Sequence, residues 1–260
     1  MLNVLNEKIE YPRPLSRQSV PCVMAFSEAY SCYAAVMMQS AFASLTSDKT
    51  YDFWVLHTDI GIKRQRELQA LSRRWPQVSL RFLDVNQWVD AIGFRLNKIR
   101  CVTHVSKETY YRLLVPDIFR YYEKIIYLDC DLIVLRDIAQ LYDEPMGNAW
   151  IAAVLDVDHA GQYNGATKIV RIFCDDILKL KRPFSYIQAG VLVMNIHRIN
   201  NELGMDTLLH IAQRGMYLYV DQDVINQQCE GHIHTLPMNW NVLTDCRGLR
   251  IKNRIFYNNR

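Results

Sequence analysis

Two carboxylates stand one residue apart where an apolar run ends. Asp129 and Asp131 follow the segment KIIYL and flank a single cysteine, Cys130. In an extended chain, residues two apart project on the same side, about 6.5 Å apart, so two like charges there repel unless a cation lies between them. Mg²⁺ and Mn²⁺ prefer such oxygen ligands, together with phosphate oxygens. The pair therefore predicts a divalent-metal site, and the alternative is that Asp131 or Asp137 caps a short helix over RDIAQLY.

Strands and helices in alternation must position these carboxylates. Ser106, with Thr109 three residues later, predicts the N-terminal cap of one helix, whereas GQYNGATK predicts a loop. Short apolar runs rich in branched and aromatic residues predict strands at residues 19–26, 51–58, 78–85, 124–129, 149–156 and 186–196. Segments with helical apolar spacing predict helices at residues 30–45, 61–75, 106–119 and 221–231.

This order of elements predicts an α/β fold with a mostly parallel central sheet and helices on both faces. Ligands of such sheets bind beyond the carboxyl ends of the strands. Asp129 and Asp156 fall at that end of their strands, and Ser27 and Glu28 follow the first strand. No internal repeat or linker interrupts the chain, so we expect one domain over residues 1–260.

Composition excludes several classes of protein. The 260 residues are 50% hydrophobic, with a formal net charge of +3 and no basic stripe, which argues against nucleic acid as a partner. No apolar run approaches the roughly 18 residues of a membrane span, and the N-terminus lacks a signal pattern. Seven cysteines without a C-x-x-C pair indicate a cytosolic protein, in which Cys22, Cys130 and Cys174 are expected as small core residues.

Four blocks in a fixed order carry a family resemblance. They read YYRLLVPDIF, KIIYLDCDLIV, YIQAGVLVMNI and DQDVIN. In this order they resemble the family 8 retaining glycosyltransferases, the family of lipopolysaccharide galactosyl- and glucosyltransferases and of glycogenin. The resemblance implies a GT-A fold, a nucleotide-sugar donor such as UDP-glucose or UDP-galactose, and Mn²⁺ (or Mg²⁺) as cofactor.

The same resemblance assigns roles to individual residues. Asp129 and Asp131 match the metal-binding pair, and Arg112 matches an arginine that contacts the donor. A guanidinium beside a diphosphate donates planar, charge-assisted hydrogen bonds, whereas the alternative for Arg112 is a surface ion pair on a helix. The remaining expected contacts with the nucleotide and its phosphates are Ala25, Ser27, Tyr30, Cys130 and Gly190.

Four polar residues match positions around the donor sugar. They are Asp156, Gln188, Asp221 and Gln222, with Ala189 and Gly190 beside them. By itself Asp156 could equally be a strand-end cap, and Asp221 with Gln222 could be the first helical turn, where acids are favoured by the helix dipole. Gly190 either admits close backbone approach to a ligand or marks a bulge.

The sequence departs from the family pattern in three places. FSEAY replaces the acidic segment after the first strand that reads uracil, so only Tyr30 keeps its place. Gln188 stands where asparagine is usual. The late H-Y-x-G-x-x-K-P-W segment, which supplies a histidine ligand to the metal, has no counterpart here, and His232 and His234 come too early to match. We therefore expect the domain to lack its C-terminal segment.

These observations predict a metal-dependent hexosyltransferase that moves glucose or galactose, with retention, to a saccharide or glycolipid acceptor such as bacterial lipopolysaccharide. The alternative is a catalytically weak nucleotide-sugar-binding or priming protein, which the missing histidine favours and the intact D-C-D disfavours. We expect a cytoplasmic location, with peripheral association at the inner face of the membrane through the missing tail. The sugar, the acceptor, the route to retention and the oligomeric state are left open.

Overall fold

The computed structural model describes residues 10–91, 106–166, 168–203 and 208–243. Its centre is one seven-stranded sheet with the strand order β3-β2-β1-β4-β6-β5-β7. The strands are β1 (Val20–Ala25), β2 (Tyr51–His57), β3 (Val78–Asp84), β4 (Lys124–Leu128), β5 (Ile151–Leu155), β6 (Ile187–Asn195) and β7 (Ile233–Thr235).

Strand direction determines which residues meet at the sheet edge. β1, β2, β3 and β4 pair in parallel, and β5 pairs in parallel with β7. β6 is antiparallel to both β4 and β5, so it begins at the edge where those two strands end. The mostly parallel sheet is confirmed, and its one reversed strand brings the start of β6 beside the carboxyl ends of its neighbours.

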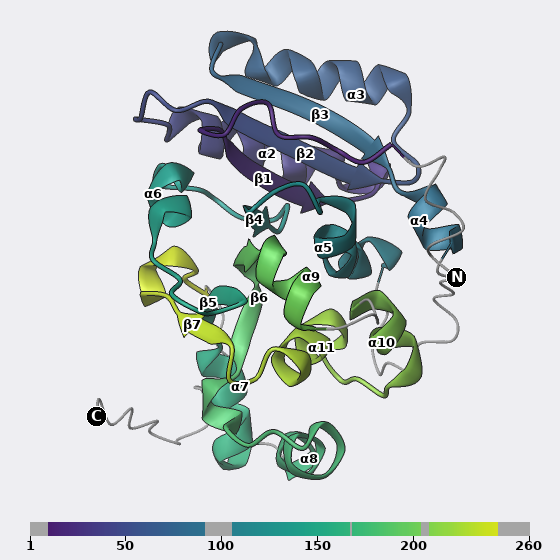
Figure 1. Cartoon of the computed structure of the whole chain (residues 1–260), viewed down its shortest axis with the longest axis vertical. Helices are drawn as coiled ribbons and strands as arrows, with labels where there is room; N and C mark the ends of the chain where they lie inside the picture. Colours follow the sequence, from purple (N-terminus) through teal and green to yellow (C-terminus); the bar gives the residue numbers. More distant parts are fainter. Residues whose placement is uncertain (1–9, 92–105, 167, 204–207, 244–260) are drawn as a thin grey trace.

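Helices cover both faces of this sheet, as expected. β1 and β2 are buried along their whole length, and their alternate residues enter two separate cores. Val23 and Leu56 face one core, with η4 (Lys107–Leu114), α5 (Val115–Ile118), α9 (Ile196–Glu202), α10 (Leu208–Arg214) and α11 (Val220–Gln228). Met24 and Phe53 face the other, with α2 (Ser31–Ala43) and α6 (Ile138–Asp143). This period-2 division follows from the pleat of a strand. Figure 1 shows α9, α10 and α11 gathered beside β6.

The helical elements are given in chain order. Up to β5 they are η1 (Glu28–Tyr30), α2 (Ser31–Ala43), α3 (Ile62–Gln69), η2 (Ala70–Arg74), α4 (Asn86–Ala91), η4 (Lys107–Leu114), α5 (Val115–Ile118) and α6 (Ile138–Asp143). After β5 they are α7 (Val157–Gly161), η5 (Gln162–Ala166), α8 (Lys168–Ile172), η6 (Phe173–Leu178), η7 (Pro183–Ser185), α9 (Ile196–Glu202), α10 (Leu208–Arg214), α11 (Val220–Gln228) and η8 (Met238–Trp240). None of the helices in the described ranges is long and apolar enough to cross a bilayer.

The helix predicted at 106–119 begins where expected but is not one α-helix. It is a 3₁₀ helix followed by the short α5, because Pro116 has no N–H to donate to the carbonyl of Arg112. Val115 donates to that carbonyl instead. Ser106 holds the N-cap position, as predicted, but its side chain makes no capping hydrogen bond to the backbone.

Two further local predictions need correction, and the choice between two capping residues is decided. GQYNGATK was predicted as a loop, but its described residues, 161–166 and 168, form helical turns that bend at Gly165, where φ is +124°. Asp137, not Asp131, caps α6, with its side chain accepting from the N–H of Ala139. Cys22 and Cys174 are buried as predicted, whereas Cys130 is only partly buried.

Candidate active site

The candidate site lies where β1, β4 and β5 end and β6 begins. The first strand leads into Ser27 and Tyr30, the fourth into Asp129 and the fifth into Asp156. The backbone N–H of Asp129 donates to the carbonyl of Gly190 at 2.8 Å, which joins the end of β4 to the start of β6. Strand direction thus brings the predicted residues at the ends of β1, β4 and β5 and the start of β6 to one edge, whereas Arg112, Asp221 and Gln222 reach it from η4 and α11.

Asp129 and Asp131 do not continue the strand as the spacing argument assumed. β4 ends at Leu128, and Cys130 and Asp131 form a turn. Asp129 is partly buried and Asp131 is exposed. Both nevertheless line the same cavity, so the turn keeps the two carboxylates available to a common ligand.

Arg112 is the electrostatic centre of the site. It reaches from η4 and is only 6% exposed. Its Nη2 lies 2.6 Å from Asp129 Oδ1, and its Nε lies 2.8 Å from Asp221 Oδ2. Nη1 donates to the carbonyl of Ala189, and the guanidinium carbon lies 4.7 Å from the ring centre of Tyr127. The alternative of a surface ion pair is therefore wrong.

Burial and charge shift the titration of this group of side chains. Burial raises the pKa of Asp129 to about 6, with Arg112 lowering it and Asp221 and Asp131 raising it. Burial likewise raises the pKa of Asp221 to about 6 against the opposing effect of Arg112. Burial alone would lower the pKa of Arg112, but the two aspartates outweigh it and raise the pKa. Asp129 and Asp221 pair with the single guanidinium of Arg112, and Asp131 lies near Asp129. The carboxylates therefore outnumber the guanidinium, and a cation would neutralise the excess negative charge.

One cavity, of about 410 Å³, lies between β1, η4 and the turn after β4. Its lining includes all seven residues of this region that were expected at the nucleotide and phosphates: Ala25, Ser27, Tyr30, Arg112, Asp129, Cys130 and Asp131. Phe26, Ser106, Glu108, Thr109, Tyr127 and Val220 complete it.

A second cavity, of about 490 Å³, meets the first at Arg112, Asp129 and Val220. Its other lining residues include Gln188, Ala189, Gly190, Asp221 and Gln222, which the family resemblance placed near the donor sugar. Gln162, Ile169, Val170, Leu218 and Tyr219 complete its lining. The two cavities thus form one continuous site of a size typical for small-molecule binding.

Gln222 connects the second cavity to Asp156. Its Oε1 accepts from the N–H of Ala189 at 2.9 Å, and its Nε2 donates to Asp156 Oδ2 at 2.9 Å. Asp156 Oδ1 accepts from the N–H of His159 at 2.8 Å, so Asp156 also caps α7. Burial raises the pKa of Asp156, although both hydrogen bonds lower it. Asp156 is not among the residues lining either cavity and contacts the site through Gln222.

Sequence reasoning missed the residues that hold α11 in place. Asn226 accepts from the N–H of Ile187 and donates to its carbonyl, at 2.8 and 2.9 Å, so it pairs with β6 as a strand would. Asp223 accepts from Tyr186 at 2.6 Å and from the N–H groups of Leu218 and Tyr219. The sequence offered only the concentration of polar residues in DQDVIN, and their separate partners are visible only in the structure.

Two other features of the site were not foreseen. Val220 has φ of +52°, a conformation that branched residues rarely adopt, and it directly precedes Asp221. Asn241 donates to Gln188 from the segment after η8. Neither residue could be recognised from a sequence motif. The strained backbone at Val220 has no sequence signature, and Asn241 lies 53 residues from its partner Gln188.

Asp129 and Asp131 suit a hard divalent cation. Their carboxylates share a cavity, and Oδ2 of Asp129 faces Gly190, where a Cβ would lie only 2.9 Å away. The described residues contain no group of three or more His, Cys, Asp and Glu that could hold a metal. His232 stacks on Trp150 at 3.9 Å, and neither it nor His234 lines either cavity, so neither is placed to complete the pair.

Residues 21–259 match the family described as Glycosyl transferase family 8. This chain belongs to that family. The family 8 chain has the GT-A fold expected from its sequence, and membership implies a nucleotide-sugar donor. Its solved structural relatives include the bifunctional glycosyltransferase WbbM, with a TM-score of 0.79 at 28% identity, covering 88% of this chain and 40% of that one.

Three other relatives are between 22% and 26% identical to this chain. The galactosyltransferase LgtC, solved with donor and acceptor sugar analogues, has a TM-score of 0.65 at 23% identity, covering 84% of this chain and 74% of that one. General stress protein A of Bacillus subtilis is 22% identical, covering 85% and 73%. Lipopolysaccharide 1,2-glucosyltransferase of Escherichia coli is 26% identical over 158 residues, covering 58% and 44%.

Proposed function

We propose that this chain transfers glucose or galactose from a UDP-sugar to a hydroxyl of a saccharide acceptor, with retention at the anomeric carbon. The observation that best supports this is the pair of cavities that meet at Arg112 and Asp129. The nucleotide occupies the cavity beside Tyr30 and the hexose the cavity beside Gln222. The bond to be broken then lies between them, at the charged group.

Asp129 and Asp131 hold Mn²⁺ or Mg²⁺ in this proposal. The bound cation supplies Lewis-acid stabilisation of the departing diphosphate. Only two carboxylates come from the described residues, so the cation takes phosphate and water oxygens for the rest of its shell, as Mg²⁺ often does. Arg112 donates one N–H of Nη1 to Ala189 and one of Nη2 to Asp129, so each nitrogen has a second N–H that would donate to a phosphate oxygen at the junction.

The same geometry favours attack by the acceptor hydroxyl from the face that the nucleotide leaves. The bond from the anomeric carbon to phosphate oxygen breaks with its electron pair, a bond to the acceptor oxygen forms, and the acceptor proton passes to the departing phosphate. A double displacement would need an uncommitted carboxylate. Asp221 is paired with Arg112, Asp156 is bonded to Gln222 and His159, and the Gln222 amide is a poor nucleophile.

The acceptor we propose is a bacterial surface glycan such as lipopolysaccharide, the class named for the Escherichia coli relative. Polar groups that would orient the donor hexose are Gln188, Asp221 and Gln222, with Asp156 acting through Gln222.

The test is release of UDP from UDP-glucose and UDP-galactose with Mn²⁺, together with calorimetry of UDP binding. Asp129→Asn and Asp131→Asn should each abolish Mn²⁺-dependent UDP binding and release. Asp143→Asn, an exposed aspartate paired with Lys49, is the matched control and should behave as the parent. UDP binding without release in the parent would support the binding-only alternative, and equal activity in all three variants would place the metal elsewhere.

A further inference from the structure

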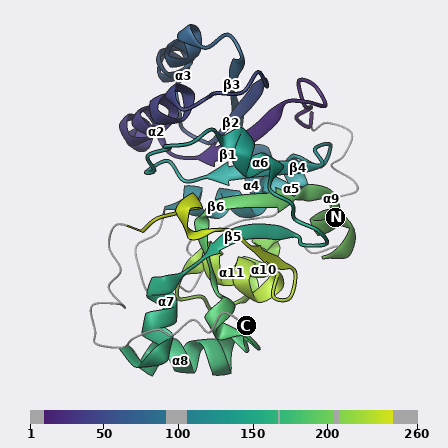
Figure 2. The ribbon, with the colours of Figure 1, turned by 90° about the vertical axis from the view of Figure 1, so that its left-hand side faces the viewer.

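Residues 168–185, between β5 and β6, form a projecting segment that we name the α8 lobe. It comprises α8, η6 and η7. Figures 1 and 2 both place α8 at the end of the molecule farthest from β3. The lobe buries a single stripe, Val170, Cys174 and Leu178, at the i, i+4, i+8 spacing of one helical face. Most of its other side chains are exposed.

The exposed surface of the α8 lobe is rich in large apolar side chains. Ile169 is 61% exposed, Ile172 56%, Ile177 42% and Phe184 46%. Single exposed apolar residues are normal, but four within sixteen residues mark a surface suited to an apolar partner. Ile169 and Ile172 are three residues apart on α8 and therefore neighbours on its surface.

The same lobe has a net positive charge. Its basic residues are Lys168, Arg171, Lys179, Lys181 and Arg182, and all five are exposed. Against them stand Asp175 and Asp176, so the lobe has a net charge of +3, equal to the formal net charge of the whole chain. Exposed aliphatic groups among Lys and Arg are the composition that binds anionic lipid surfaces.

We propose that the α8 lobe docks on an anionic lipid bilayer, inserting its isoleucines and Phe184 between headgroups that its lysines and arginines pair with. The lobe borders the second cavity, so docking would bring the membrane close to the site. Ile169 and Val170, with Gln162 just before the lobe, line the second cavity. A bilayer against the lobe would therefore present membrane-attached saccharide at the mouth of that cavity. This goes beyond the proposed transfer, which requires no membrane.

A second group of exposed apolar side chains can test whether lipid binding requires basic residues as well as apolar ones. Ile133 is 61% exposed and Leu135 84%, in the loop between β4 and α6. The loop lies against α2, since Val134 N–H donates to Ser40 Oγ at 2.9 Å. Residues 29–45 contain no Lys or Arg, and the loop carries Asp131 with Arg136 directly after Leu135, so their charges offset each other. This patch has no net positive charge for anionic lipid to select, so it provides a matched control.

The experiment is co-sedimentation of the full chain with unilamellar vesicles, either pure phosphatidylcholine or phosphatidylcholine with phosphatidylglycerol. We expect at least tenfold stronger partitioning into the anionic vesicles, lost at high salt. Lys168→Glu with Lys181→Glu should weaken it about 30-fold or more, because each basic residue near the surface contributes roughly fivefold. Ile172→Ser with Ile177→Ser should weaken it about tenfold.

The control variant, Ile133→Ser with Leu135→Ser, removes two exposed aliphatic side chains as well and should bind the anionic vesicles within about twofold of the parent. UDP binding should stay unchanged in all three variants, because none of the altered residues lines the nucleotide cavity. Equal partitioning into both kinds of vesicle would overturn the proposal, as would lobe variants that bind like the parent. If the control loses as much as the lobe variants, docking is not specific to the lobe and the proposal fails. Release of UDP from UDP-sugar in solution is measured separately, so failure of either proposal is recognised independently.

Discussion

Asp129 and Gly190 are packed so closely that residue 190 has room only for hydrogen. The Asp129 N–H donates to the Gly190 carbonyl at 2.8 Å, and an added Cβ would lie 2.9 Å from Asp129 Oδ2. That carboxylate is held on its other oxygen by Arg112. The absence of a side chain at Gly190 therefore gives the Asp129 carboxylate its room. The close approach that the glycine permits in this structure is between its backbone and the side chain of Asp129.

We expect Gly190→Ala to impair the site more than the fold. The methyl group would push Asp129 Oδ2 aside, whereas alanine suits a strand as well as glycine does. Mn²⁺-dependent UDP affinity should fall at least tenfold, about 1.4 kcal/mol, while the free energy of unfolding changes by about 1 kcal/mol or less. Calorimetry and urea titration measure the two. Gly61→Ala, whose Cβ would meet Glu28 at an ordinary 3.5 Å, is the control and should alter neither.

Gln222→Glu should reduce turnover without weakening nucleotide binding. The substitution removes the N–H that donates to Asp156 Oδ2 and places a second carboxylate about 3 Å from it. The two negative charges repel each other, so one carboxyl is expected to stay protonated. Donor-sugar orientation would be lost, whereas the nucleotide cavity does not include Gln222. We expect kcat for UDP release to fall about 100-fold with UDP affinity within threefold of the parent. Gln228→Glu, at the end of the same helix, should preserve both, and an equal loss in both variants would count against the role of Gln222.

The sequence was sufficient for six of the seven strands, because most of these are apolar runs rich in branched and aromatic residues. β1 and β2 are buried along their whole length, so their apolar pattern is strong. β7 was not predicted, because its three residues are too few to form an apolar run. The direction of β6 was not readable, since period and composition are the same in both directions. That direction decides which end of 187–195 meets Asp129, and so it determines the geometry of the site.

The candidate site was predicted by residue but not by contact. Arg112, Asp129 and Asp221 come from three separate blocks, and their mutual pairing depends on tertiary packing. The D-C-D spacing implied an extended chain, but the backbone turns after Leu128 and places Asp131 in solvent. Asn226 was missed because a buried amide that pairs with a strand looks like any polar residue on a helix.

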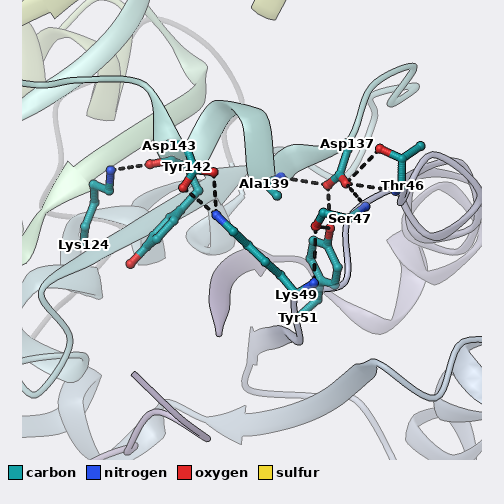
Figure 3. A network of polar contacts seen from close by, with 9 residues as sticks. All are labelled: Thr46, Ser47, Lys49, Tyr51, Lys124, Asp137, Ala139, Tyr142 and Asp143. Atoms are coloured by element: carbon teal, nitrogen blue, oxygen red, sulfur yellow. Dashed lines mark hydrogen bonds and ion pairs between the residues drawn. The ribbon is translucent and has the colours of Figure 1, made fainter. Parts of the chain in front are cut away.

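Asp137→Asn should destabilise the fold by about 2–3 kcal/mol. Figure 3 shows its carboxylate accepting from the N–H groups of Thr46, Ser47 and Ala139 and from Tyr51, at 2.7–2.9 Å. Burial would raise the pKa of Asp137, but these donors lower it, and an asparagine amide would turn a donor toward them. Urea denaturation at neutral pH measures the loss.

The matched control for Asp137 stands at the other end of α6. Asp143 is paired with Lys49 but its side chain is 58% exposed, so Asp143→Asn should cost at most about 0.5 kcal/mol. Equal stability of the two variants would show that the buried cap does not anchor the loop that follows Asp131.

His159 should make the fold sensitive to acid above the range of most carboxylates. The ring is 2% exposed, stacks on Tyr186 at 3.6 Å, and its Nδ1 has no hydrogen-bond partner among the described residues. Burial lowers the pKa of His159 from 6.5 to about 4. Between pH 6.5 and 4, His159 is protonated in the unfolded chain but not in the folded chain. Its contribution to stability is therefore fully present above pH 6.5 and is lost as the pH falls toward 4.

The measurement is the free energy of unfolding in urea at pH 7 and at pH 4.5, for the parent and for His159→Phe. The lowered pKa corresponds to a loss of up to about 3 kcal/mol in the parent across the window from pH 6.5 to 4. Phenylalanine keeps the stack on Tyr186 and cannot be protonated, so most of the difference between the two pH values should disappear in that variant. His197→Phe, at an exposed position, should keep the parent's pH dependence. If His159→Phe loses stability with acid as steeply as the parent does, the acid sensitivity arises from other groups and the buried ring is not its cause.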